Sequence, residues 1–379
     1  MSDLYQRPGN EPRFLLANRW RSEGGGKPSV QYHIMSRVKL RQMLYPKDVA
    51  EYRYQDIVVK PMSLLLGAEV DNVDLKANLT DLQEIEILQA LHQYKVCFFR
   101  GQNISARRQV ELVKIFSDKL GITSDSEQKK KSSKDGIFVH PFLPQKKGQE
   151  NIWPVGSSVG YATTGRPLRS VSDKSVDSPR VDRGTGSWLR PPYSGTSANV
   201  WHADNTFLRE PSSFTILQAK RLPEFGGDTC FADMGQAYAD LSAEVKMKLR
   251  GLRVVHDWRQ AFPYFKRTCT LDEYRSLEKL YPPVLHPVVR KHPVTGQNVL
   301  YVNRAFSTRL ENGDRNMFNF LADKASVPEY QIRFKWQNVG DIAMWDNRVL
   351  QHYAVNDYIG EQRLMEHTAS LGEKPIFGN

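Results

Sequence analysis

A histidine and an aspartate lie two residues apart in the segment NVWHADNTF, at residues 199–207. The flanking residues favour a β-strand, in which residues i and i+2 point to the same face. His202 and Asp204 could therefore direct an imidazole nitrogen and a carboxylate oxygen at one point, as two ligands of a metal ion. The same pattern also fits an ordinary polar pair at the end of a strand. The pair alone does not decide between these interpretations.

A third ligand must come from another part of the chain, and His352 is the best candidate. It follows GDIAMWDNRVLQ, which predicts a buried strand and a turn. Two histidines and one carboxylate on one side of a metal form the facial triad of non-haem Fe(II) oxygenases. Arg363 follows eleven residues later, and its guanidinium could bind the distal carboxylate of a 2-oxoglutarate cosubstrate. Thr229, in GGDT, could donate a second hydrogen bond to that carboxylate.

Five segments together resemble the taurine dioxygenase family of Fe(II)- and 2-oxoglutarate-dependent oxygenases. They are WHADNTF, RLPEFGGDTCFADM, HPVVRKHPVTGQNVLYVN, GDIAMWDNRVLQHYAVNDY and RLMEHTASLGEKP. The resemblance also includes VKPMSLLLGAEVDNVDL and spans roughly residues 56–122 and 199–375. It implies a mainly β fold with flanking helices (α+β), whose core is a double-stranded β-helix, or jelly roll, with the iron at one end.

The resemblance also implies the roles of the site residues. His202, Asp204 and His352 match the iron ligands, and Thr229 and Arg363 match the residues that bind 2-oxoglutarate. The implied cofactors are Fe(II), 2-oxoglutarate and O2, and the implied reaction couples decarboxylation to succinate and CO2 with hydroxylation, or desaturation, of a substrate. The presence of Asp204 counts against the halogenating variant of this fold, which leaves that ligand position open for a halide. We interpret residues 345–348 (WDNR) as structural support for the strand before His352, with Trp345 in the core.

Departures from the family pattern concern the substrate. The sulfonate-oxidising members have a second arginine four residues after the first, whereas this chain has His367. His140 matches a pocket histidine, but Leu143 replaces the tyrosine and Ala198 replaces the asparagine that the family has nearby. The substrate-pocket candidates are His140, Leu143, Ala198, Asn205, Phe207 and His367. We therefore expect a small to medium organic substrate, larger and less strongly anionic than taurine, in a biosynthetic tailoring step or in the catabolism of an organic acid.

Other functions stay open at this point. A sulfonate or sulfate-ester dioxygenase is the main alternative, and the missing arginine counts against it. A non-catalytic binding protein of the same fold and a nucleic-acid dealkylase with the same cofactors are more distant. We expect a small-molecule substrate as the partner, with neither nucleic acid nor a membrane, and a homo-oligomer remains open.

The elements that would position these residues are mostly short strands with turns between them. Helical periodicity follows the N-cap candidates Thr80 and Ser105, and KVCFFRG, SFTILQAKRL, GGDTCFADM and QRLMEHTAS predict strands. A hairpin is expected around HPVTGQ. Many short strands favour a double-sheet jelly roll over a βαβ fold. His256, His286 and His292 are interpreted as structural residues, and His92 as a surface residue.

The net charge of +11 is concentrated in two segments of the 379-residue chain. Residues 1–55 hold ten Lys/Arg against five Asp/Glu, residues 123–198 hold twelve against seven, and the rest carries about +1. We predict an N-terminal extension at 1–55 and one dioxygenase domain at 56–379 with a basic insertion at about 123–198. The insertion, with Trp153, Tyr161, Trp188 and Tyr193, is either a lid over the pocket or a surface elaboration.

The remaining composition favours a cytoplasmic protein. No apolar run reaches the roughly 20 residues of a membrane span, and the first thirty residues lack the apolar core of a signal peptide. Three scattered cysteines predict neither a disulfide framework nor a zinc site. The basic segments do not interleave aromatic and basic residues as single-strand binders do, so a solvated basic surface is the preferred interpretation.

Overall fold

The computed structural model describes residues 13–20, 29–36, 54–122, 133–134, 136–143, 150–156, 199–263, 266, 269–358 and 361–378. The chain divides into two units, Met1–Arg53 and Tyr54–Asn379. In the first unit, β1 (Arg13–Trp20) and β2 (Ser29–Ser36) pair antiparallel. No helix in the described ranges is long and apolar enough to cross a membrane.

A seven-stranded sheet forms the larger wall of the second unit. Its strands, in spatial order, are β3 (Val58–Pro61), β4 (Ala68–Asp71), β5 (Val96–Phe99), β17 (Ile342–Asp346), β9 (Phe214–Arg221), β19 (Leu364–Ala369) and β8 (Trp153–Gly156). Neighbouring strands are antiparallel except β4 and β5, which are parallel. The register places Trp345 opposite Thr215, so side chains from β17 and β9 reach the same point beside the site.

A three-stranded sheet packs against the inner face of this wall. Its strands are β16 (Gln331–Phe334), β10 (Thr229–Asp233) and β18 (Leu350–Ala354). Phe98 of the larger sheet stacks on Phe334, with ring centroids 3.8 Å apart, and meets Phe231 edge-on at 5.6 Å. Because apolar side chains from both sheets fill one core, the two layers form the predicted jelly roll.

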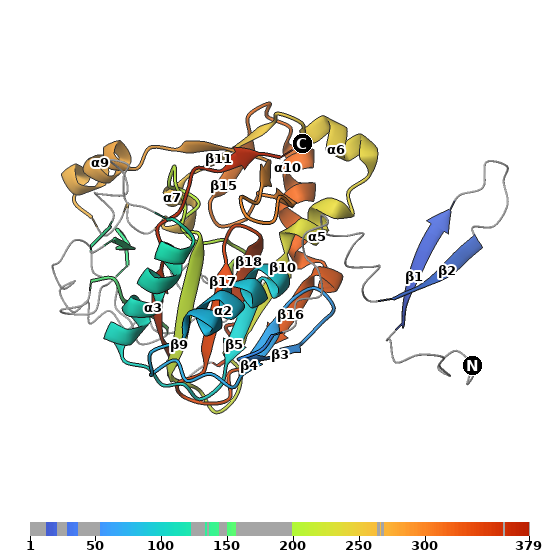
Figure 1. Cartoon of the computed structure of the whole chain (residues 1–379). Coiled ribbons are helices and arrows are strands. Elements are labelled where there is room, and N and C mark those ends of the chain that lie inside the picture. Colours follow the sequence, from blue (N-terminus) through green and yellow to red (C-terminus); the bar gives the residue numbers. More distant parts are fainter. Residues whose placement is uncertain are drawn as a thin grey trace. The chain divides into compact units, whose positions relative to one another are not determined.

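The outer face of the larger sheet is covered by two helices, α2 (Asp81–Tyr94) and α3 (Ala106–Lys119) (Figure 1). Period-two alternation along β5 explains the two faces, since Phe98 points into the jelly roll whereas Cys97 and Phe99 pack under the helices. Both helices begin as predicted. Thr80 forms a capping box at the start of α2, and the Ser105 side chain caps α3.

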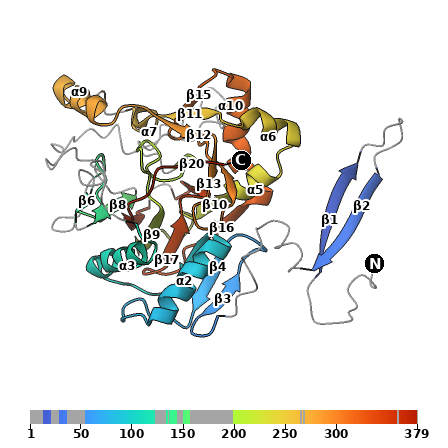
Figure 2. The same ribbon diagram turned by 45° about the horizontal axis from the view of Figure 1, so that its top comes forward.

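The remaining elements surround one end of the jelly roll. Two three-stranded sheets join β12 (Val284–Pro287), β11 (Arg253–His256) and β15 (Ser307–Leu310), and β14 (Asn298–Leu300), β13 (Val289–Lys291) and β20 (Ile376–Phe377). A short pair joins β6 (Ser133–Lys134) and β7 (Ile137–Phe138). The helices are α5 (Met234–Ala239), α6 (Ala243–Leu249), α7 (Trp258–Ala261), α9 (Leu271–Leu280) and α10 (Arg315–Ala322), with 3-10 turns at Asp323–Ser326 and Pro328–Tyr330. Figures 1 and 2 show α5, α6 and α10 gathered on one side and α9 on the other. The hairpin expected around HPVTGQ is β13–β14.

Part of the stretch expected as an insertion belongs to the main sheet. Strand β8 is an edge strand that pairs antiparallel with β19, with Trp153 opposite His367. Trp153 is buried, as are Phe138 and Phe142 in the preceding described segment. These residues therefore contribute to the core around the site, whereas Tyr161, Trp188 and Tyr193 lie outside the described residues.

Candidate metal centre and cosubstrate site

Backbone pairing brings the two candidate histidine ligands together. His202 and His352 form an antiparallel bridge in which the His352 amide donates to the His202 carbonyl at 2.7 Å, and the reverse bond measures 3.1 Å. Their ring centroids are 4.0 Å apart. Residues far apart in the sequence thus present neighbouring imidazoles because the segment before Asp204 lies against β18.

Asp204 reaches the same point by a turn, so the prediction of a strand over residues 199–207 is wrong. His202 forms an isolated β-bridge, and residues 204–207 form a turn. Asn205 has a φ of 58°, a left-handed conformation that asparagine tolerates better than most residues. Asp204 Oδ1 lies 3.9 Å from His202 Nε2 and 3.7 Å from His352 Nε2.

The donor set fits a divalent metal ion. One potential ligand atom from each of His202, Asp204 and His352 lies within 4.8 Å of the others, and all three residues are buried. His202 Nδ1 donates to the Val200 carbonyl at 2.6 Å, which leaves the Nε2 lone pair for a metal. Burial lowers the pKa of both histidines, which favours the neutral imidazole that a metal requires.

The carboxylate of the set stays ionised. Burial by itself would raise the pKa of Asp204, but the neighbouring imidazoles outweigh that effect and hold the pKa well below its usual range. Two neutral imidazoles and one carboxylate are the donors of the facial-triad oxygenases. The structure therefore brings together the three residues that the sequence singled out.

Arg363 and Thr229 lie together beside the three candidate ligands. Arg363 Nη2 is 3.4 Å from Thr229 Oγ1, and Arg363 Nε donates to the Gly227 carbonyl at 2.8 Å. Burial lowers the pKa of Arg363, yet a guanidinium starts so far above neutrality that it keeps its charge. A buried cation beside a hydroxyl is the pair that a ligand carboxylate needs.

Trp336 is a member of this site that the sequence did not indicate. Its indole Nε1 donates to Thr229 Oγ1 at 3.0 Å. Because that oxygen already accepts from Trp336 and faces Arg363, the single hydroxyl hydrogen of Thr229 can point toward a bound carboxylate. Trp336 comes from a loop after β16, and no spacing in the sequence links it with Thr229.

A tight turn brings the backbone close to Arg363. Gly226 and Gly227 have φ values of 78° and 71°, and the amide of Gly227 donates to Asp357 Oδ1 at 2.7 Å. A Cβ atom added to Gly227 would lie 2.9 Å from Arg363 Cδ. Glycine is therefore required here both for the left-handed backbone and for the close approach of the arginine.

The three candidate metal ligands, together with Thr229 and Arg363, line one pocket. It holds about 770 Å³ of empty space, part of it open to solvent. Its other wall is mainly apolar and includes Leu143, Trp153, Phe262 and Phe306. Of the substrate-pocket candidates, the structure places four along the pocket, namely His140, Leu143, Asn205 and His367. Phe207 is buried behind the wall against Phe142 and Phe306, and Ala198 lies outside the described residues.

Both pocket histidines lie against Trp153, and backbone amides also hold His140. His140 Nδ1 accepts from the amides of Phe142 and Leu143 at 3.1 and 3.0 Å, and burial lowers its pKa to about 3, so the ring is neutral. His367 stacks on Trp153 with centroids 4.4 Å apart. His367 Nε2 is also 3.4 Å from Asp204 Oδ2, so this side chain faces the metal site as well as the pocket.

Two other histidines hold the turn that carries Asp204. His286 Nε2 lies within hydrogen-bonding distance of the carbonyls of Thr206 and Leu208, at 3.0 and 2.9 Å, and His256 Nδ1 is 2.9 Å from Thr206 Oγ1. Neither lines the pocket, in agreement with their structural interpretation. His92, expected at the surface, is instead half-buried with its Nε2 3.3 Å from Arg348 Nη2.

A jelly roll whose open end holds two imidazoles, one carboxylate and a buried arginine is the architecture of a mononuclear metal- and 2-oxoglutarate-dependent oxygenase. The chain belongs to the taurine catabolism dioxygenase TauD, TfdA family, which matches residues 58–369. Enzymes of this family use Fe(II), 2-oxoglutarate and O2. The protein is therefore a 2-oxoglutarate-dependent dioxygenase, an oxidoreductase.

Relatives of the chain carry the names of different substrates. It is 29% identical over 327 residues to an alkylsulfatase of Acinetobacter baylyi, with 84% of this chain and 86% of the relative covered. It is 26% identical over 325 residues to an alpha-ketoglutarate-dependent 2,4-dichlorophenoxyacetate dioxygenase of Cupriavidus pinatubonensis, with 84% and 99% covered. The crystal structure of a taurine dioxygenase from Burkholderia xenovorans matches with a TM-score of 0.60 and 26% identity, over 86% of this chain and 95% of that one.

Proposed function

We propose that this dioxygenase hydroxylates, or desaturates, a small to medium organic molecule other than taurine in a biosynthetic tailoring step. His202, Asp204 and His352 hold Fe(II), and Arg363 and Thr229 hold the distal carboxylate of 2-oxoglutarate. Residues 56–379 act as one catalytic domain, and residues 1–55 are an extension to it. When bound, the iron and 2-oxoglutarate supply the activation of O2 that oxidises a substrate C–H bond.

The observation that carries the proposal is that the three candidate ligands and Arg363 line the same pocket. The protein's own contribution is to fix these groups before substrate arrives. The Val200 carbonyl sets the tautomer of His202, and the Gly227 carbonyl and Thr229 hydroxyl orient the Arg363 guanidinium. The aromatic wall excludes water from the side where a substrate would lie.

The charge of the pocket supports a substrate that is not strongly anionic. Arg363 is the one guanidinium or ammonium group among the described lining residues, and the proposal assigns it to 2-oxoglutarate. A sulfonate would then have histidines rather than a second cation of fixed charge beside it. We propose that His140, Leu143, Asn205 and His367 contact the substrate, together with the stacked ring of Trp153.

A sulfonate or sulfate-ester dioxygenase is the second candidate. It is supported by the relationship to the alkylsulfatase of Acinetobacter baylyi, which covers most of both chains. The two candidates differ in products. Hydroxylation of the carbon that bears a sulfonate group releases sulfite, and hydroxylation of the carbon that bears a sulfate-ester oxygen releases sulfate, each leaving a carbonyl compound.

The first test is an anaerobic titration of the apo protein with Fe(II) and 2-oxoglutarate. We expect a weak visible charge-transfer band, which His202→Ala abolishes while thermal unfolding shows that the variant is folded. A wild-type protein without the band would refute the proposal. A panel of taurine, an alkyl sulfate and uncharged analogues, scored by succinate formation, then identifies the substrate. Succinate formed with the alkyl sulfate, together with sulfate release, would establish the second candidate instead.

A further inference from the structure

The two oxygens of the Asp204 carboxylate have different surroundings. Oδ1 faces the Nε2 atoms of His202 and His352, at 3.9 and 3.7 Å. Oδ2 points away from them, accepts a 2.6 Å hydrogen bond from Thr215 Oγ1 and lies 3.4 Å from His367 Nε2. Only Oδ1 is thus available to a metal between the imidazoles.

A chain of buried hydrogen bonds extends behind Thr215. The Thr215 oxygen accepts from Asn347 Nδ2 at 2.9 Å, and Asn347 Oδ1 accepts from Trp345 Nε1 at 2.8 Å. Asn347 Oδ1 also accepts from the backbone amide of Asp204 at 3.2 Å.

The direction of this chain follows from its ends. An indole N–H can only donate, so the oxygen of the Asn347 amide must face Trp345 and its NH2 group must face Thr215. The single hydroxyl hydrogen of Thr215 then goes to Asp204 Oδ2. Every donor in the series therefore points toward the carboxylate, and Asn347 holds both the backbone and, through Thr215, the side chain of Asp204.

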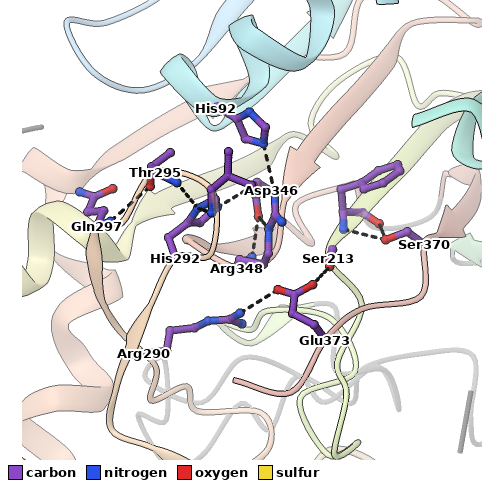
Figure 3. A network of polar contacts seen from close by, with 12 residues as sticks. His92, Ser213, Arg290, His292, Thr295, Gln297, Asp346, Arg348, Ser370 and Glu373 are labelled. Atoms are coloured by element: carbon purple, nitrogen blue, oxygen red, sulfur yellow. Dashed lines mark hydrogen bonds and ion pairs between the residues drawn. The ribbon is translucent and has the colours of Figure 1, made fainter. Parts of the chain in front are cut away.

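The supporting residues are buried, and further contacts hold the backbone beside them. Thr215 on β9 lies opposite Trp345 on β17, and Thr215, Trp345 and Asn347 are at most 2% exposed. On either side of Asn347, the Arg348 guanidinium donates to both oxygens of Asp346, at 2.8 and 2.7 Å (Figure 3). His292 Nε2 lies 3.0 Å from Asp346 Oδ2 in the same network. The Asn347 side chain consequently projects from a backbone segment that is clamped on both sides.

We propose that Thr215 and Asn347 are positioning residues that hold Asp204 as a one-oxygen metal ligand and fix its orientation before the metal binds. This inference rests on the proposed function, in which Asp204 binds the iron. Loss of an outer hydrogen bond to a metal-binding carboxylate typically weakens metal affinity by roughly 10- to 100-fold. The hydroxyl of Thr215 should account for an effect of that size, although it does not touch the metal.

The test measures the affinity of the full-length apo protein for Mn(II) alone, from the EPR signal of the free ion. Thr215→Val keeps the shape of the side chain but removes the hydroxyl, and we expect roughly 10- to 100-fold weaker binding. Thr215→Ser keeps the donor and should restore affinity close to the wild type. Thr368→Val is the matched control, because the Thr368 hydroxyl on neighbouring β19 is buried and has no hydrogen-bond partner among the described residues. It should bind Mn(II) as the wild type does.

The outcomes separate this inference from the proposed function. Wild-type protein that fails to bind Mn(II) would overturn the metal site itself. Wild-type binding that Thr215→Val leaves unchanged would overturn only the positioning role. Equal losses in Thr215→Val and Thr368→Val would also overturn it, because the effect would then come from any buried change in the sheet. Thr215→Ala is measured in parallel, so that a folding defect in one variant leaves the other to decide.

Discussion

Gly227→Ala should separate the cost of an unfavourable backbone from the loss of 2-oxoglutarate binding. The residue has a φ of 71°, and an added Cβ would lie 2.9 Å from Cδ and 3.2 Å from Nε of Arg363. Real Cβ contacts this short do not persist, so the arginine must move. The guanidinium would then leave the position in which it faces Thr229 Oγ1 and donates to the carbonyl of residue 227.

Two magnitudes follow from this geometry. The left-handed backbone costs an alanine roughly 1–2 kcal/mol of folding stability. A misplaced guanidinium loses a hydrogen bond to a charged group, which contributes about 1.5–3 kcal/mol. Because each 1.4 kcal/mol corresponds to tenfold in a dissociation constant, 2-oxoglutarate should bind about 10- to 100-fold more weakly.

The assay combines thermal unfolding with calorimetric titration of 2-oxoglutarate into the Mn(II)-loaded protein. Gly251→Ala is the control, because Gly251 has a φ of 69° and nothing within 4 Å of an added Cβ. We expect both variants to lose similar stability and only Gly227→Ala to lose affinity. If Gly227→Ala bound 2-oxoglutarate as tightly as Gly251→Ala, the role given to Arg363 would be wrong.

Two further predictions concern buried polar contacts around the site. Trp336→Phe removes the hydrogen-bond donor to Thr229 Oγ1. The loss of roughly 1 kcal/mol should weaken 2-oxoglutarate binding about fivefold in the same calorimetric titration. Unchanged affinity would contradict this role of Trp336. Burial lowers the pKa of His286 to about 4, against about 6.5 in an unfolded chain. As pH falls from about 6.5 to 4 the unfolded chain takes up a proton that the folded protein does not, so up to about 3 kcal/mol of stability should be lost. In urea titrations of the metal-free protein, His286→Gln should show a shallower decline over that range, and an identical decline would refute this assignment.

The sequence predicted the ligands of the site better than the way the backbone presents them. His202 and Asp204 were identified by their residue types and spacing, because two donors so close together suit a metal. The reason given from the sequence, that residues i and i+2 of one strand point to the same face, does not explain why the two side chains meet. The backbone turns at Asn205, and the hydrogen bonds that stabilise this turn come from His256 and His286, on strands some fifty and eighty residues away.

Long-range contacts account for the other residues that the sequence did not indicate. Trp336 and Thr229 are separated by 107 residues, and they meet because β16 and β10 pair. Trp345 is fully buried, as the core interpretation predicted, but it also lines the pocket, with its ring centroid 4.6 Å from that of His352. Local periodicity specifies that a residue is buried. Local periodicity does not specify whether the buried side chain also faces a pocket.

The two walls of the pocket come from different parts of the chain, so the residues for the reaction and the residues that contact the substrate can be considered separately. The candidate ligands and Arg363 lie in segments that carry the family resemblance, on or beside β10, β18 and β19. His140, Leu143 and Trp153 on the opposite wall come from residues 123–198, between those segments. The segments with the candidate ligands and Arg363 would then support the reaction, and residues of the opposite wall would contact the substrate. Substitutions at Trp153 or Leu143 should consequently change the KM for substrate more than the affinity for 2-oxoglutarate.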